Sequence, residues 1–160
     1  MAKLQDCQFI EIKIDNKPIK GASTEAAYKD WLEGYVPMGI ATYSGPDGTH
    51  FDSTHISLLV TKESSNFFEQ YLKRGYKNIT ITTVHRGSDE YSANYEIQRI
   101  TYTDCKIQSL HYEMRDKLFM NINFIFEGEV DLTINVPNAA ESGLDKIGPI
   151  KYDIPTKALK

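Results

Sequence analysis

The stretch from Ile56 to Val84 constrains the fold more than any other, because its apolar periodicity changes twice. Ile56, Leu58 and Val60 recur at every second position, which predicts a strand. The next apolar residues are spaced as one face of a helix: Phe67, Phe68, Tyr71 and Leu72. Alternation then resumes from Ile79 to Val84. We therefore expect one short helix between two strands.

Polar residues predict where this helix begins and ends. Asn66 can accept a backbone N–H at the first turn, and Glu69 follows three residues later, the spacing of a capping box. Lys73 and Arg74 complement the negative end of the helix dipole. Gly75 can adopt the left-handed conformation that ends helices. The predicted helix thus begins near Asn66 and stops at Gly75.

Period-2 alternation is typical of the remaining chain and is clearest between Leu118 and Phe126. One face of that segment is apolar: Leu118, Met120, Ile122, Phe124 and Phe126. Residues 130–136 alternate in the same way. Consecutive strands joined by short turns pair antiparallel, and about seven to nine of them can close a barrel. The sequence predicts a mainly β fold, an antiparallel β-barrel with one short α-helix.

Two further segments carry less regular patterns. Glycine and proline interrupt Trp31–Tyr43, which favours a bent or bulged strand near a sheet edge. The turn formed by Gly45, Pro46, Asp47 and Gly48 follows, and it predicts a protruding hairpin between Gly39 and Ser57.

The apolar density falls after Pro137. We expect one domain over residues 1–160, with a core of about 8–137 and a C-terminal extension at 138–160. Within the extension, residues 138–148 are expected to be a surface segment. Residues 151–160 are expected to be a mobile tail with room for a short strand at Tyr152 and Ile154.

Composition restricts the kinds of molecule that this protein could bind. The net charge of −4 is spread over interspersed signs, so no basic stripe predicts a nucleic-acid partner. No apolar run reaches the roughly 20 residues that span a bilayer, and the N-terminus lacks the apolar region of a signal peptide. We expect a protein made in the cytoplasm, with Cys7 and Cys105 as reduced thiols.

No motif predicts catalysis, a metal site or a cofactor. The histidines at positions 50, 55, 85 and 111 have no metal-ligand spacing, and His55 and His85 could meet only if their strands pair. No nucleophile elbow, phosphate loop or dinucleotide fingerprint is present in the sequence. We expect a protein that is not an enzyme and binds neither a metal nor a cofactor.

A family resemblance rests on the order of several segments. A strand leads through Thr61-Lys62 and Ser64-Ser65 into the amphipathic helix and the next strand. Near the N-terminus, Ile14-Asp15 and Ile19-Lys20-Gly21 flank Asn16-Lys17-Pro18. Over about residues 8–137 the chain resembles Hcp, the haemolysin co-regulated protein that forms the inner tube of type VI secretion systems. The departure is Asn16-Lys17-Pro18, where the family has a single glycine in an I-D-G-I-K-G run.

The resemblance implies that copies of the chain assemble into a larger structure. Hexameric rings would stack into a tube inside a contractile sheath, tipped by a spike, and would be secreted without a signal peptide. The lumen would carry and chaperone effector proteins, so the implied partners are further copies of the chain, sheath and spike proteins, and effectors. Barrel walls would meet edge to edge around the ring. The turn at Gly45, Pro46, Asp47 and Gly48 would be a ring or stacking interface.

Two other functions stay open at this point. A monomeric lipocalin-like barrel could hold a small apolar ligand against the Leu118–Phe126 stripe. A bacteriophage tail-tube protein would share the ring-forming barrel.

Overall fold

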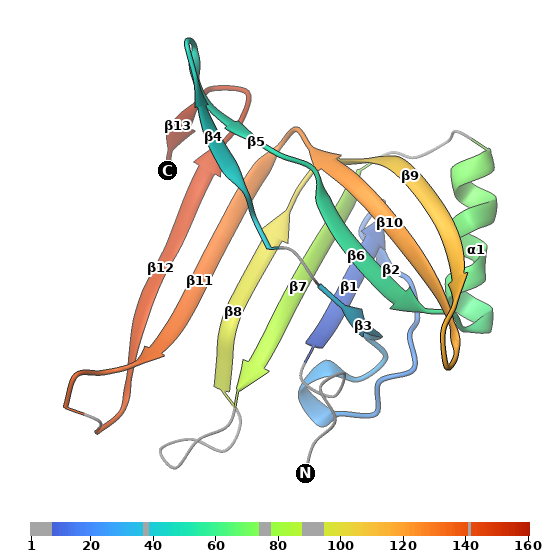
Figure 1. Cartoon of the computed structure of the whole chain (residues 1–160). Helices are drawn as coiled ribbons and strands as arrows, with labels where there is room; N and C mark the ends of the chain where they lie inside the picture. The colour runs from blue at the N-terminus through green and yellow to red at the C-terminus, as the bar shows by residue number, and fades with distance from the viewer. Residues whose placement is uncertain (1–7, 37–38, 74–77, 88–94, 141) are drawn as a thin grey trace.

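The computed structural model describes residues 8–36, 39–73, 78–87, 95–140 and 142–160 (Figure 1). Its described residues form strands for the most part, with one α-helix and a short 3₁₀ turn at Ala26–Tyr28. In chain order the elements are β1 (Gln8–Ile14), β2 (Lys17–Pro18), β3 (Leu32–Tyr35), β4 (Thr42–Gly45), β5 (Gly48–Phe51), β6 (Thr54–Leu59), α1 (Lys62–Leu72), β7 (Ile79–Gly87), β8 (Tyr95–Tyr102), β9 (Cys105–Met114), β10 (Leu118–Phe126), β11 (Glu129–Pro137), β12 (Leu144–Asp153) and β13 (Ala158–Leu159).

One long antiparallel path connects all of these strands except the β4–β5 pair. Its order is β13-β12-β11-β8-β7-β1-β3-β6-β10-β9, with β2 paired to β1. The path folds over at β3, so that β6, β10 and β9 lie in front of β1, β7 and β8 (Figure 1). Among the residues that the structure describes, no ladder joins β9 to the opposite half, and α1 lies beside β9. The expectation of an antiparallel, barrel-like β fold with one helix is confirmed.

The fold at β3 requires a glycine. β3 pairs with β1 on one side and with β6 on the other, where Gly34 lies opposite Leu58. A Cβ on Gly34 would clash with the backbone carbonyl of Ser57. The glycine that weakened the strand pattern is therefore what lets two backbones approach closely at the junction.

The main core lies between the two halves of the path. Met120, Ile122 and Phe124 of β10 are fully buried, and the Phe124 ring meets the edge of the Tyr102 ring from β8 at 5.3 Å. The predicted apolar face of 118–126 is confirmed except at Leu118, which is 36% exposed. Each such buried side chain contributes about 1.5–3 kcal/mol to folding. Side chains fill this interior, so the stripe does not line an open ligand cavity.

A smaller cluster covers the outer face of β1 and β7. Phe9 of β1 stacks on Tyr28 at 4.3 Å, and Tyr28 meets Trp31 edge to face at 5.3 Å. Val84 of β7 completes this buried group. The 3₁₀ turn therefore packs on the sheet, which explains why the neighbours Phe9 and Ile10 are both buried although they point to opposite faces.

The segment Trp31–Tyr43 is not one bent strand. It contributes the separate strands β3 and β4, which pair with different partners. Pro37, one of the residues that predicted the bend, lies outside the described residues. The aromatic and β-branched composition predicted strand here, but it carried no information on the change of partner.

The helix begins four residues earlier than the sequence predicted. Thr61 is the N-cap, and its side chain accepts the Ser64 N–H at 3.2 Å while the Ser64 hydroxyl accepts the Thr61 N–H at 2.7 Å. This reciprocal pair has capping-box spacing, and Asn66 lies within the helix. Lys73 is the C-cap, and its ammonium pairs with Glu69 at 3.1 Å. The predicted contributions of Arg74 and Gly75 lie outside the described residues.

The buried face of α1 also differs from the predicted face, at Leu72. Phe67 is buried in the main core, and the Phe68 ring packs on Tyr112 of β9 at 5.4 Å. Leu72 was predicted on this face but is 62% exposed. Ser64, Phe67, Phe68 and Tyr71 instead make up the face, which follows the helical spacing of three and four residues.

The C-terminal segment is not a tail. β12 pairs with β11 from Glu129↔Asp153 to Pro137↔Leu144, and β13 pairs with the end of β12. The register shifts between Leu132 and Ile134, opposite Gly148-Pro149. The short strand expected at Tyr152 and Ile154 is the end of β12, which includes Tyr152 and stops at Asp153. The bulge breaks the alternation of the earlier part of β12 in the sequence, which is why residues 144–151 were not predicted as strand.

The cap assignment predicts a difference between two single substitutions. Thr61→Ala removes the side-chain acceptor of the first turn and should lower the free energy of unfolding by about 1 kcal/mol. Asn66→Ala changes an exposed interior position and should not destabilise the protein. Urea unfolding followed by circular dichroism measures both. A larger loss for Asn66→Ala would contradict the observed helix start.

The difference in burial between Phe67 and Leu72 on α1 predicts that substitutions at these two residues differ in their effect on stability. Phe67→Ala should lower the free energy of unfolding by about 3–5 kcal/mol, because it leaves a cavity in the main core. Leu72→Ala, on the same helix, should change it by less than about 0.5 kcal/mol. Comparable losses for the two variants would show that α1 is rotated from the orientation described.

Candidate interaction surface

The predicted hairpin is present and projects from the body of the molecule (Figure 1). We call residues 42–51, which form β4, β5 and their turn, the hairpin arm. Gly45 pairs with Gly48 at its tip, so the predicted turn is confirmed. Gly48 has φ +125°, a backbone conformation open mainly to glycine. A Cβ on Gly45 would lie 2.6 Å from the ring of His50.

Side chains stiffen the tip and connect it to the C-terminal strands. His50 Nε2 lies 2.8 Å from Asp47 Oδ1, and the His50 ring stacks on Tyr43 at 5.3 Å. The hydrogen bond from His50, helped by the charge of Lys157, lowers the pKa of Asp47. Lys157 Nζ donates to the Asp47 backbone carbonyl at 3.0 Å. The loop between β12 and β13 therefore holds the tip.

The base of the hairpin arm is held by aromatic packing. The Phe51 ring lies 5.4 Å from Phe126 of β10 and 5.5 Å from Tyr152 of β12. Phe126 belongs to the buried core. The hairpin arm is thus held at its tip and at its base. It lies over the face of β11 and β12 whose apolar side chains, Leu132 and Tyr152, pack against the main core.

A groove remains between the hairpin arm and these strands. Its volume is about 380 Å³, and nearly all of its lining is apolar. We call it the arm groove, lined by Ile40, Thr42, Thr49, Phe51, Val130, Leu132, Ile150, Tyr152 and Leu159. Ile150 is 44% exposed and Leu159 is 73% exposed. These exposed apolar side chains make the arm groove a candidate interaction surface.

A second surface is polar. On the outer side of β6, β10 and β9 the side chains form two hydrogen-bonded rows across the strands, and we call this surface the polar face. Ser57, Asn121 and His111 form one row, with Ser57 Oγ 2.6 Å from Asn121 Oδ1 and Asn121 Nδ2 3.0 Å from His111 Nε2.

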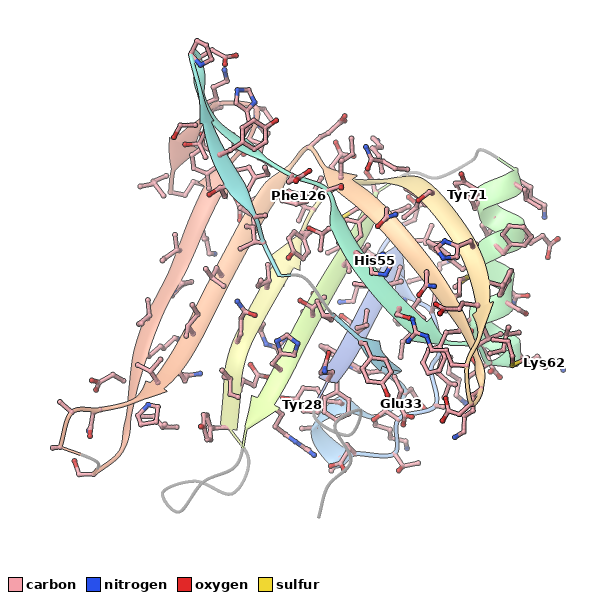
Figure 2. All side chains as sticks on the ribbon, viewed as in Figure 1. Tyr28, Glu33, His55, Lys62, Tyr71 and Phe126 are labelled. Atoms are coloured by element: carbon pink, nitrogen blue, oxygen red, sulfur yellow. The ribbon has the colours of Figure 1, made fainter. Side chains whose placement is uncertain are left out.

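The second row of the polar face lies next to the first. His55 Nδ1 lies 2.8 Å from Asn123 Oδ1, and Asn123 Nδ2 donates to Ser109 Oγ at 2.9 Å. Figure 2 shows His55 on β6. The sequence analysis considered His55 only with His85 and His111 only for metal-ligand spacing, so it did not predict these two rows. The signal for the polar face was the placement of Asn121 and Asn123 on the second face of the clearest predicted strand.

The remaining candidate residues are dispersed. His55 lies on β6, whereas His85 of β7 lies 3.3 Å from Gln8, so the two histidines do not meet. Within the described ranges, no three His, Cys, Asp or Glu side chains gather as metal ligands. Cys105 is buried, and desolvation raises the pKa of its thiol to about 12. Cys7 lies outside the described residues.

Comparison with known proteins identifies the fold. No family model and no curated protein matches the sequence. Among solved structures, a type six secretion system protein superposes with a TM-score of 0.70 at 17% identity, covering 95% of this chain and 99% of its own. Hcp1 from Salmonella typhimurium gives 0.63 at 14% identity, covering 96% and 99%. Secreted protein Hcp3 from Pseudomonas aeruginosa gives 0.64 at 11% identity, covering 91% and 96%.

These likenesses extend over nearly the whole of each chain. The protein therefore has an Hcp-like fold, as the sequence resemblance implied. None of the helices in the described part of the chain is both long and apolar enough to span a bilayer.

The geometry of the tip predicts the effect of adding one methyl group. Gly48→Ala should lower the free energy of unfolding by about 1–3 kcal/mol, because it forces a side chain onto a backbone conformation that glycine alone adopts readily. Among the described residues other than its chain neighbours, Lys157 Cδ at 3.9 Å is the one heavy atom within 4 Å of the added Cβ, so lack of space is not the cause.

Gly39→Ala is the matched control. Apart from its chain neighbours, no heavy atom of the described residues lies within 4 Å of its added Cβ, so it should change stability by less than about 0.5 kcal/mol. Equal thermal unfolding midpoints for the two variants would contradict the turn geometry.

Proposed function

We propose that this chain is a tube subunit of a type VI secretion apparatus. The observation that carries the proposal is the Hcp-like fold, shared over nearly the full chain with proteins of that apparatus. In this function six copies form a ring, rings stack, and the tube is expelled with its spike. The role is assembly rather than catalysis.

Self-assembly into a ring needs two different surfaces on each copy. The arm groove offers the first, because its exposed Ile150 and Leu159 lose contact with water when a second copy covers them. The projecting tip of the hairpin arm offers the second, and Gly45, Pro46, Asp47 and Gly48 reach a neighbouring copy in the ring or in the next ring.

Backbone pairing along the edge of β12 adds little to this contact. β13 pairs only with Tyr152 and Asp153, which leaves residues 144–150 without an outer strand in the described part of the chain. However, Gly148-Pro149 interrupts that edge, and proline has no N–H to donate. Side chains of the arm groove, rather than a continuous ladder, therefore carry the contact between copies.

The other partners follow from the same function. Sheath and spike proteins surround and tip the tube, and effector proteins travel in its lumen, where polar side chains select them. The chain is made in the cytoplasm and leaves the cell with the contracting apparatus. A phage tail tube would use the same ring, and it would be distinguished by the proteins that assemble around it.

Mass measurement in solution tests the proposal. Size-exclusion chromatography with light scattering should show a species of six chains, each of 18.2 kDa, with six-fold rings in negative-stain images. A monomer at every concentration would overturn the proposed function.

A pair of variants tests whether the arm groove forms the contact between copies. Leu159→Asp places a charge in the arm groove and should shift the wild-type assembly toward monomer. Leu72→Asp places the same charge on the exposed side of α1, a residue 62% exposed and away from the arm groove, and should leave assembly unchanged. Assembly that tolerates Leu159→Asp as well as Leu72→Asp would exclude the arm groove as the contact.

A further inference from the structure

The amide of Asn121 has only one possible orientation on the polar face. Its Nδ2 lies 2.7 Å from Glu113 Oε2, and its Oδ1 lies 3.4 Å from a guanidinium nitrogen of Arg115. An ionised carboxylate only accepts hydrogen bonds, and a guanidinium only donates them. Nδ2 must therefore face Glu113, and Oδ1 must face Arg115.

This orientation sets the protonation state of His111. The same Asn121 Nδ2 lies 3.0 Å from His111 Nε2, so Nε2 has to accept and carries no proton. The neutral ring then holds its proton on Nδ1. On the other side of the amide, the Ser57 hydroxyl donates to Asn121 Oδ1 at 2.6 Å.

Protonation of His111 conflicts with this arrangement. A proton on Nε2 places an N–H against the Asn121 NH₂, so that two donors face each other. Asn121 cannot turn to present its oxygen without setting its NH₂ against Arg115 and its oxygen against Glu113. It is 3% exposed, so water cannot easily replace the lost partners. His111 is exposed, and its ring can turn to solvent.

We propose that His111 is a proton-sensitive latch on the polar face, which accepts a hydrogen bond from Asn121 only while Nε2 is unprotonated and loses that one bond on protonation. Glu113, Arg115 and Ser57 keep their own contacts with Asn121. The latch links β9 to β10 by a side-chain contact that acid removes. Protonation of His111 therefore changes the hydrogen bonding of the polar face.

The charged groups nearest the latch are Glu113 and Arg115, which pair with each other at 2.9 Å. The hydrogen bond from Arg115, followed by that from Asn121, lowers the pKa of Glu113, which favours its ionised carboxylate. The charge of Glu113 attracts the imidazolium, but its bond to Asn121 Nδ2 holds the amide in the orientation that rejects the added proton. His55 belongs to the adjacent row.

The adjacent row of the polar face, which contains His55, serves as an internal control for the latch. His55 contacts Asn123, whose NH₂ reaches the Ser109 hydroxyl. A hydroxyl both donates and accepts, so this row can take either amide orientation. Protonated His55 can still donate from Nδ1 to the Asn123 oxygen. Protonation of His55 therefore leaves its contact with Asn123 in place.

Nuclear magnetic resonance on the ¹⁵N-labelled full chain tests the latch from about pH 8 to about pH 5. At the upper end, His111 should be the Nδ1–H tautomer. On acidification the side-chain NH₂ resonances of Asn121 should shift with the same midpoint as the His111 ring. His111→Gln, which does not titrate, should leave them constant, whereas His55→Gln should leave the shift in place.

Three results would overturn the proposal. The first is an Nε2–H tautomer of His111 in the wild type, a measurement that needs no variant. The second is an Asn121 NH₂ signal that stays constant while His111 titrates. The third is an unchanged titration of that signal in His111→Gln.

Discussion

The rest of the structure depends on one packing contact, in which the β6-β10-β9 half of the strand path covers the half that contains β1, β7 and β8. Phe124 on β10 and Tyr102 on β8 meet across that contact, and both are fully buried. Because apolar burial is the dominant favourable contribution to folding, this contact sets where the path folds over. The close approach at Gly34 lets β3 take part in both halves. α1 then packs beside β9, and the hairpin arm is left standing over β11 and β12.

Local patterns predicted most of the elements, because they depend on neighbouring residues alone. Alternation identified β10, and the switch of period identified α1. The helix start was missed because two polar pairs have capping-box spacing and only tertiary packing decides between them. Only the end of β12, at Tyr152, was expected as strand, because the bulge at Gly148-Pro149 shifts the register of the part before it. No local signal predicts that Phe51 contacts both Phe126 and Tyr152, so the arm groove could not be foreseen.

A shared fold at 11–17% identity is consistent with how such a core tolerates change. Side chains of suitable size and polarity pattern preserve an architecture while most residues differ. Function is more demanding, because it depends on particular surfaces. Here the surfaces are the apolar arm groove and the polar face, which lie on different strands and carry different chemistry. The first suits the contact between copies that we propose, whereas the second holds a hydrogen-bond network that includes two histidines.

The central claim is that the arm groove is covered by a second copy of the chain. A cryo-electron microscopy map of the assembled particle tests it most directly. The account predicts density from a neighbouring copy over Ile150 and Leu159, with the tip of each hairpin arm touching another copy. A particle in which the arm groove faces solvent would contradict it.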